Sequence, residues 1–64
     1  MLLGKIQAKS MVVFNQNNGR RIAVSHITIK AGDVILARAS FGGNWSDEQA
    51  LKEYYRLPKR FTAA

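Results

Sequence analysis

Hydrophobic and polar positions alternate along the first two thirds of the chain with a period of two. Within 2–14, Ile6, Ala8, Val12 and Phe14 fall on even positions and Lys5, Gln7 and Lys9 on odd ones, although Met11 and Val13 break the alternation. The stretches 21–30 and 34–41 are rich in β-branched and apolar residues. This periodicity is typical of half-buried strands. We therefore expect strands at about 2–14, 21–30 and 34–41.

The first two strands are predicted to form a β-hairpin. Asn18-Gly19 between them is the dipeptide preferred in a type I′ turn, where both central residues take positive φ. Such a turn pairs residues whose numbers sum to 37 and leaves an exposed, polar tip at 15–21. The second turn is predicted at Lys30-Ala31-Gly32-Asp33, where the glycine tolerates positive φ.

A helix is predicted at about 46–57, after the connection Gly42-Gly43-Asn44. Ser46 is a suitable N-cap and Gln49 completes a capping box, while Asp47 and Glu48 suit the positive end of the helix dipole. Pro58 ends the helix, and a loosely held basic tail covers 58–64. The aromatic residues expected in the core are Phe14, Phe41, Trp45, Tyr54 and Tyr55, whereas Phe61 is expected to be free.

Both faces of the predicted sheet carry apolar side chains. The two turns place on one face Ile6, Ala8, Val12, Phe14, Ile27, Ile29, Val34 and Leu36. They place on the other Met11, Val13, Ile22, Val24, Ile35, Ala37, Ala39 and Phe41, with Lys5, Gln7, Lys9, His26, Thr28 and Lys30. Because one helix covers one face, the sheet either coils into a half-barrel or buries its second face against another copy. We favour a homodimer through the sheet.

The predicted fold class is thus α+β, a three-stranded antiparallel β-meander followed by one C-terminal α-helix, in a single domain spanning 1–64. The chain has 64 residues, so its core is small. It has no cysteine and one histidine, which argues against disulfides, a metal site or a cofactor. Neither a signal peptide nor a membrane span is expected, and the predicted location is the cytoplasm.

The charge of the chain indicates a polyanionic partner. Ten Lys and Arg residues stand against four Asp and Glu residues, a formal net charge of +6. Such a balance favours nucleic acid, DNA or RNA, or else an acidic protein surface. The candidate nucleic-acid-binding residues are Arg20, Arg21, Asn17 and Asn18 at the hairpin tip, Lys5, Lys9 and Lys30 on one sheet face, and Lys52, Arg56, Lys59 and Arg60 along the helix and tail.

Groups for catalysis are scarce. Ser25 and His26 are neighbours on a strand, so their side chains are expected on opposite faces rather than as a nucleophile and its base. His26 is interpreted as a sheet-face or interface residue, and Gly42-Gly43-Asn44 as a flexible connection rather than an anion-binding loop. We therefore expect a binding protein and no enzyme.

Two partial resemblances favour nucleic acid as the partner. The stretch 35–41 leading into Ser46-Asp47-Glu48-Gln49-Ala50 resembles the last strand and helix start of the DNA-binding domains of AP2 type and of the arm-binding domains of tyrosine integrases, whose three-stranded sheet enters the major groove. Asn18-Gly19, Ser25-His26-Ile27 and Gly32-Asp33 are similar to a strand-turn-strand region of OB-fold proteins. No site residue is carried over from either. The alternative function is a protein-binding inhibitor or adaptor, of the kind that phages and mobile elements direct at a host complex.

Overall fold

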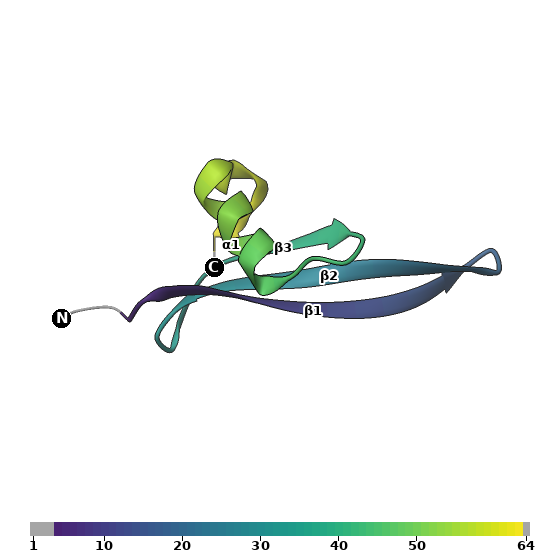
Figure 1. Ribbon diagram of the computed structural model, residues 1–64, viewed down its shortest axis with the longest axis horizontal. Coiled ribbons are helices and arrows are strands. Elements are labelled where there is room, and N and C mark those ends of the chain that lie inside the picture. Colours follow the sequence, from purple (N-terminus) through teal and green to yellow (C-terminus); the bar gives the residue numbers. More distant parts are fainter. Residues whose placement is uncertain (1–3, 64) are drawn as a thin grey trace.

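The computed structural model of the protein describes residues 4–63, which form one antiparallel sheet and one α-helix. The elements in chain order are β1 (Ile6–Asn17), β2 (Arg20–Ala31), β3 (Val34–Gly42), α1 (Asp47–Arg56), the 3-10 helix η1 (Pro58–Arg60) and β4 (Thr62–Ala63). The sheet order is β1-β2-β3-β4, so β1 and β4 are its edges. The molecule measures 50 × 21 × 19 Å, and the β1–β2 hairpin forms its long axis (Figure 1). The predicted meander followed by a helix is confirmed.

The hairpin has the predicted turn and register. Asn18 and Gly19 have φ values of 53° and 77°, and every β1–β2 pair from Ile6↔Ala31 to Asn17↔Arg20 sums to 37. β1 and β2 extend to Asn17 and Arg20, beyond the predicted ends at 14 and 21, because a two-residue turn leaves no further residues in the loop. Gly4 and Lys5 precede β1, and the remainder of the predicted strand start, residues 2 and 3, lies outside the described residues.

The predicted faces of β3 are wrong beyond its first residues, because a β-bulge shifts the register between Ile29 and Lys30. Up to that point Ala31↔Val34 and Lys30↔Ile35 follow the turn, but the next pairs are Ile29↔Ala37 and Ile27↔Ala39. One extra residue in β3 moves every later side chain to the opposite face. The residues moved to the face of Ile27 and Ile29 are Ala37, Ala39 and Phe41.

The core lies between this face of the sheet and α1, which lies over the half of the hairpin farther from its tip (Figure 1). Its buried members come from all three long strands, the helix and the C-terminal segment: Ala8, Ile27, Ile29, Ala37, Ala50 and Phe61. Half-buried residues complete it: Ile6, Leu36, Ala39, Phe41, Trp45, Leu51 and Tyr54. A core built largely of alanine and isoleucine lets the helix approach the sheet closely, since few long side chains intervene.

The predicted helix start and end are confirmed. Ser46 Oγ accepts a 3.1 Å hydrogen bond from the Gln49 backbone N–H, and the Ser46 N–H donates to Gln49 Oε1 at 3.0 Å. The capping box therefore satisfies two backbone donors that the helix itself leaves unpaired. The helix ends at Arg56, before Pro58. Neither helix in residues 4–63 has the length and apolar character that a membrane crossing requires.

The connection between β3 and α1 is held at several points, which corrects its interpretation as a flexible segment. The buried Ser25 hydroxyl donates to the Gly43 carbonyl at 2.7 Å and accepts the Trp45 N–H at 3.0 Å. Ser10 Oγ donates to the Trp45 carbonyl at 2.7 Å. Two strand hydroxyls thus replace backbone pairing where the chain leaves the sheet, and no buried side-chain polar atom among the described residues lacks a partner.

The C-terminal segment is part of the fold, so the prediction of a loose tail with a free Phe61 is wrong. Phe61 is 7% exposed, and its ring packs edge-on against Phe41 at 5.5 Å and Tyr54 at 5.3 Å between ring centres. The following residues pair with β3 through Ala37↔Ala63 and Arg38↔Thr62. A single aromatic residue in the tail supplies the apolar surface that fixes it to the core.

Two aromatic residues expected in the core are exposed instead. Phe14 is 55% exposed because it lies on the part of the hairpin beyond β3, whose last pair with β2 is Val24↔Gly42. Tyr55 is 61% exposed, since Tyr54 already occupies the inward stripe and the next residue turns by about 100° around the helix.

Candidate nucleic-acid interface

The sheet face opposite α1 is covered by no part of the chain that the structure describes, and we call it the open face. It carries the odd-numbered side chains of β1, the even-numbered side chains of β2, and Arg38, Ser40 and Thr62, which pair with Thr28, His26 and Arg38 in turn. Because a paired sheet holds these positions in fixed register, their spacing is set by the backbone rather than by side-chain contacts.

Three side chains form a row across the open face, Lys9 on β1, Thr28 on β2 and Arg38 on β3. Thr28 pairs with Lys9 on one side and with Arg38 on the other. The two cations therefore stand two strand spacings apart, roughly 10 Å between their Cα atoms. Lys30 lies on the same face in the adjacent row, paired with Gln7. The predicted grouping of Lys9 with Lys30 is confirmed, whereas Lys5 precedes the strand.

Arg38 is the residue that sequence reasoning missed. The predicted register placed it on the side of Ile27 and Ile29, and the bulge turns it to the open face. A signal was present in β3, where apolar Ala37, Ala39 and Phe41 alternate with polar Arg38 and Ser40. That alternation requires the alanines to face the core, and it is compatible with the first turn residues only if one residue is extra.

The hairpin projects beyond β3 as an arm, residues 14–23, with exposed side chains along nearly all of its length (Figure 1). Arg20 pairs with Asn17 and Arg21 with Gln16, so successive guanidiniums point to opposite sides of the ribbon. The Arg21 guanidinium lies 4.9 Å from the centre of the Phe14 ring, a cation–π distance. Both sides of the arm therefore present a fork of N–H donors close to amide side chains.

The cations of the helix and tail are placed differently, because most of them face carboxylates. Lys52 Nζ lies 3.6 Å from Glu48 Oε1, and Arg56 Nε donates to Glu53 Oε1 at 2.9 Å. Arg60 donates to the other oxygen of Glu53 and stacks 4.6 Å from the centre of the Phe41 ring. Lys59, exposed in η1, is the member of this predicted set without an ion pair among the described residues.

Glu53 is a buried carboxylate that the helix pattern did not predict. Its side chain is 7% exposed, and each of its oxygens receives one arginine. The hydrogen bond from Arg56 is the main reason that the pKa of Glu53 lies below its ordinary value of 4.5, with the charges of Arg56 and Arg60 acting in the same direction against the effect of burial. Arg60 thus joins η1 to α1, and both arginines are held in ion pairs within the fold.

Charge is segregated between the two sides of the molecule. Residues 4–42 hold six of the ten basic residues and one carboxylate, Asp33, which lies in the turn before β3. The other three carboxylates share residues 43–63 with the remaining four basic residues. The positive potential is therefore concentrated on the sheet and its arm, because the helix side is close to neutral.

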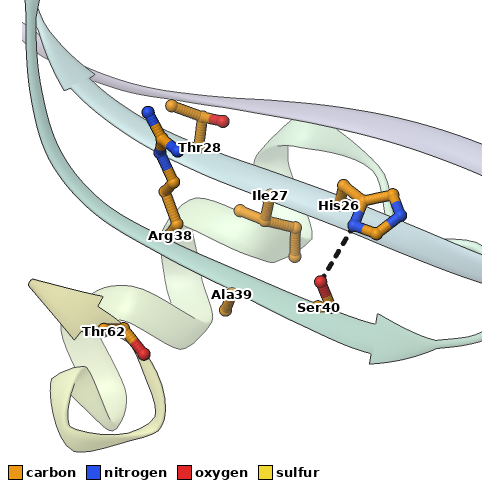
Figure 2. A pocket seen from close by; sticks show the side chains of 7 residues that line it. All are labelled: His26, Ile27, Thr28, Arg38, Ala39, Ser40 and Thr62. Carbon is orange, nitrogen blue, oxygen red and sulfur yellow. Dashed lines mark hydrogen bonds between the residues drawn. The ribbon is translucent and has the colours of Figure 1, made fainter. Parts of the chain in front are cut away.

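An apolar patch lies between the cationic row and the tip of the arm on the open face. It consists of Met11, Val13, Ile22 and Val24, with Met11 65% exposed. His26 pairs with Met11 and is exposed on this face, while its neighbour Ser25 is buried on the other face, the opposite placement that the sequence predicted. His26 Nδ1 lies 2.9 Å from Ser40 Oγ, and no carboxylate of the described residues joins the pair (Figure 2).

No known protein family, curated protein or solved structure matches this chain. The class of protein is therefore defined by the fold and the site alone. It is a one-helix α+β domain with an open four-stranded sheet that displays cations on its uncovered face and on a projecting β-hairpin arm.

Proposed function

We propose that this protein binds nucleic acid through the open face of the sheet and the arm. The observation that carries the proposal is the row Lys9–Thr28–Arg38 with Lys30 beside it, none of which has an ion pair within the described residues. Cations that no carboxylate neutralises contribute fully to the attraction of a phosphate backbone. A cytoplasmic setting, where nucleic acid is found, belongs to the same proposal.

The arm and the row would make different kinds of contact. Lysines and Arg38 on the rigid sheet suit phosphate oxygens, which fix the position of the ligand without reading its sequence. Arg20, Arg21, Asn17 and Asn18 at the tip carry forked and amide donors, which suit phosphates and base edges alike. A two-stranded ribbon fits the major groove of a duplex, so the arm is the part proposed to enter a groove.

The salt dependence of binding tests this proposal. Affinity for a mixed-sequence duplex should fall linearly with salt on logarithmic axes, with a slope of about −0.9 for each phosphate neutralised. The double variant Lys9→Ala, Arg38→Ala should bind more weakly and lower the magnitude of that slope by about 1 to 2, and Arg20→Ala, Arg21→Ala should do the same. All four side chains are exposed, so the variants should keep the fold.

Lys52→Ala is the matched control, because it removes one positive charge that already faces Glu48. It should leave the slope unchanged within about 0.3, about a third of the contribution of one phosphate contact. If Lys52→Ala changes the slope by half as much as either double variant, each lost charge has the same effect, and binding depends on net charge alone. That result would exclude the open face and the arm as a defined interface.

The second candidate is binding to a protein, as an inhibitor or adaptor. The exposed apolar patch around Met11 favours it, since apolar side chains that a monomer leaves uncovered commonly mark a protein contact. A second copy of this chain is one such partner, and light scattering on the purified protein decides whether a homodimer forms. Binding through the patch resists salt, so a stoichiometric complex that survives high salt and is lost in Met11→Asp supports this candidate instead of the first.

A further inference from the structure

The open face contains a hollow that adjoins the row Lys9–Thr28–Arg38 and has no role in the proposed function so far. It has a volume of about 470 Å³ and is lined by His26, Ile27, Thr28, Arg38, Ala39, Ser40 and Thr62 (Figure 2). Its polar members come from three neighbouring strands in direct register, through the pairs His26↔Ser40, Thr28↔Arg38 and Arg38↔Thr62. Space for several water molecules, each about 30 Å³ in the liquid, leaves room for a tetrahedral anion.

The donors around this hollow suit a phosphate group. Arg38 contributes a guanidinium with five N–H donors and no acceptor, and the hydroxyls of Thr28, Ser40 and Thr62 each have one hydrogen to donate. No Asp or Glu lines the hollow, so no fixed anion competes for these donors. We infer that the hollow binds a phosphodiester of the nucleic acid, and that protonation of His26 strengthens this contact; the inference rests on the proposed function.

The effect of the proton follows from the contact between His26 Nδ1 and Ser40 Oγ, which are 2.9 Å apart. When Nδ1 is unprotonated, Ser40 donates its one hydrogen to the ring and turns its lone pairs outward. When both ring nitrogens are protonated, Nδ1–H donates to Ser40 and the Ser40 hydrogen is released. The Nε2–H is present in both states, so one added proton raises the outward donors of the pair from one to two, through the Ser40 hydroxyl, and adds a positive charge.

The charged groups on the same face as His26 are all cations. Among the described residues these are Lys9 on β1, Lys30 and, at the tip of the arm, Arg20 on β2, and Arg38 on β3, while β4 presents the uncharged Thr62. Asp33 lies in the β2–β3 turn, and the other carboxylates, Asp47, Glu48 and Glu53, lie on α1. A bound phosphate therefore brings an anion that this face lacks. Binding of the proton and binding of the phosphate must reinforce each other by the same factor.

The test measures affinity for a mixed-sequence DNA duplex and for the matching single-stranded DNA and RNA, at constant salt. Between about pH 8 and about pH 5.5, the range in which imidazoles titrate, wild-type affinity should rise about fivefold or more. His26→Gln, which keeps a donor but cannot gain a proton, should bind at both pH values with no such rise. Ser40→Ala should reduce the rise, and Arg38→Ala should weaken binding at both pH values.

A second arm separates this inference from the proposed function. Inorganic phosphate is added to the protein at about pH 5.5, and the NMR signals of His26, Ser40 and Thr62 are followed, with Lys52 as a distant control. Shifts confined to the hollow support a phosphate subsite even if no polynucleotide binds, in which case the proposed function fails alone. Polynucleotide binding that does not depend on pH, or that keeps its pH dependence in His26→Gln, overturns the inference and leaves the proposed function standing. Absence of both responses overturns both.

Discussion

The carboxylate of Asp47 accepts a 2.7 Å hydrogen bond from the backbone N–H of Ser10 and so joins the start of α1 to strand β1. Because β1 is an edge of the sheet, alternate N–H groups along it point away from β2 and are available to other chains. Asp47 satisfies one of them, and Ser10 Oγ donates to the carbonyl of Trp45, two residues before Asp47. One acidic residue thus serves the helix dipole and the sheet edge together.

Asp47→Ala should therefore destabilise the protein by about 1–2 kcal/mol, because a charge-assisted hydrogen bond and a favourable dipole contact are lost together. Urea denaturation followed by circular dichroism measures the change. Glu48→Ala is the matched control, since it removes an acidic residue from the same helix turn without touching β1. If both variants lose the same stability, the bond to Ser10 contributes nothing of its own.

Glu53 should make the free energy of unfolding fall as the pH is lowered into the acid range. Its pKa is lowered in the folded protein, chiefly by the hydrogen bond from Arg56, so its contribution is complete above the ordinary value of 4.5 and is lost as the pH falls through the lower, folded value. Glu53→Gln should lower the melting temperature by several degrees at neutral pH and by less in the acid range. Melting curves of both proteins from neutral pH down to about pH 2 test this.

The control for this prediction is Glu48→Gln, whose side chain is 81% exposed beside Lys52. It should change the melting temperature little at any pH, since exposed ion pairs contribute little to stability. A gap between wild type and Glu53→Gln that stays constant down to the lowest pH would contradict the assignment of the acid dependence to Glu53.

Phe61 should be among the most sensitive positions of the chain, although it lies three residues from the end. Removing its ring leaves a cavity between Phe41 and Tyr54, and Phe61→Ala should cost about 3–5 kcal/mol, comparable to the total stability of a domain this small. Phe61→Leu retains much of the volume and keeps the measurement possible in a folded protein. Denaturant titration should show a loss of about 1–2 kcal/mol for this milder variant.

Tyr55→Ala is the matched aromatic control, because that ring is 61% exposed. It should change stability by no more than about 0.5 kcal/mol. The reverse order, with Tyr55 more sensitive than Phe61, would mean that the tail does not pack against the core as described.

The local features of the fold were predictable because each depends on neighbouring residues. Asn18-Gly19 sets the hairpin register through its own backbone preference, and Ser46 with Gln49 sets the helix start. The β3 faces were not predicted, because a bulge between Ile29 and Lys30 depends on how the whole strand packs. The turn residues alone gave the right pairs only as far as Ile35.

The candidate site was predictable in part for the same reason. Lys9 and Lys30 were grouped correctly because their positions follow from the hairpin alone. Arg38 was missed because its face depends on the bulge, and the pairing of Arg56 and Arg60 with Glu53 was missed because it depends on where the tail folds back. The burial of Phe61 was not predictable from the sequence, because it depends on the space between Phe41 and Tyr54 in the folded protein.

The separation of charge between sheet and helix has a consequence for how this molecule meets a ligand. A body with its excess positive charge on one broad side has a strong electric dipole moment, so an approaching polyanion rotates it before any atom touches. The sheet would therefore face the polyanion at the first encounter, and α1 would point away from it. Productive collisions then become more frequent at low ionic strength, and this advantage fades once the screening length falls below the thickness of the domain, about 20 Å.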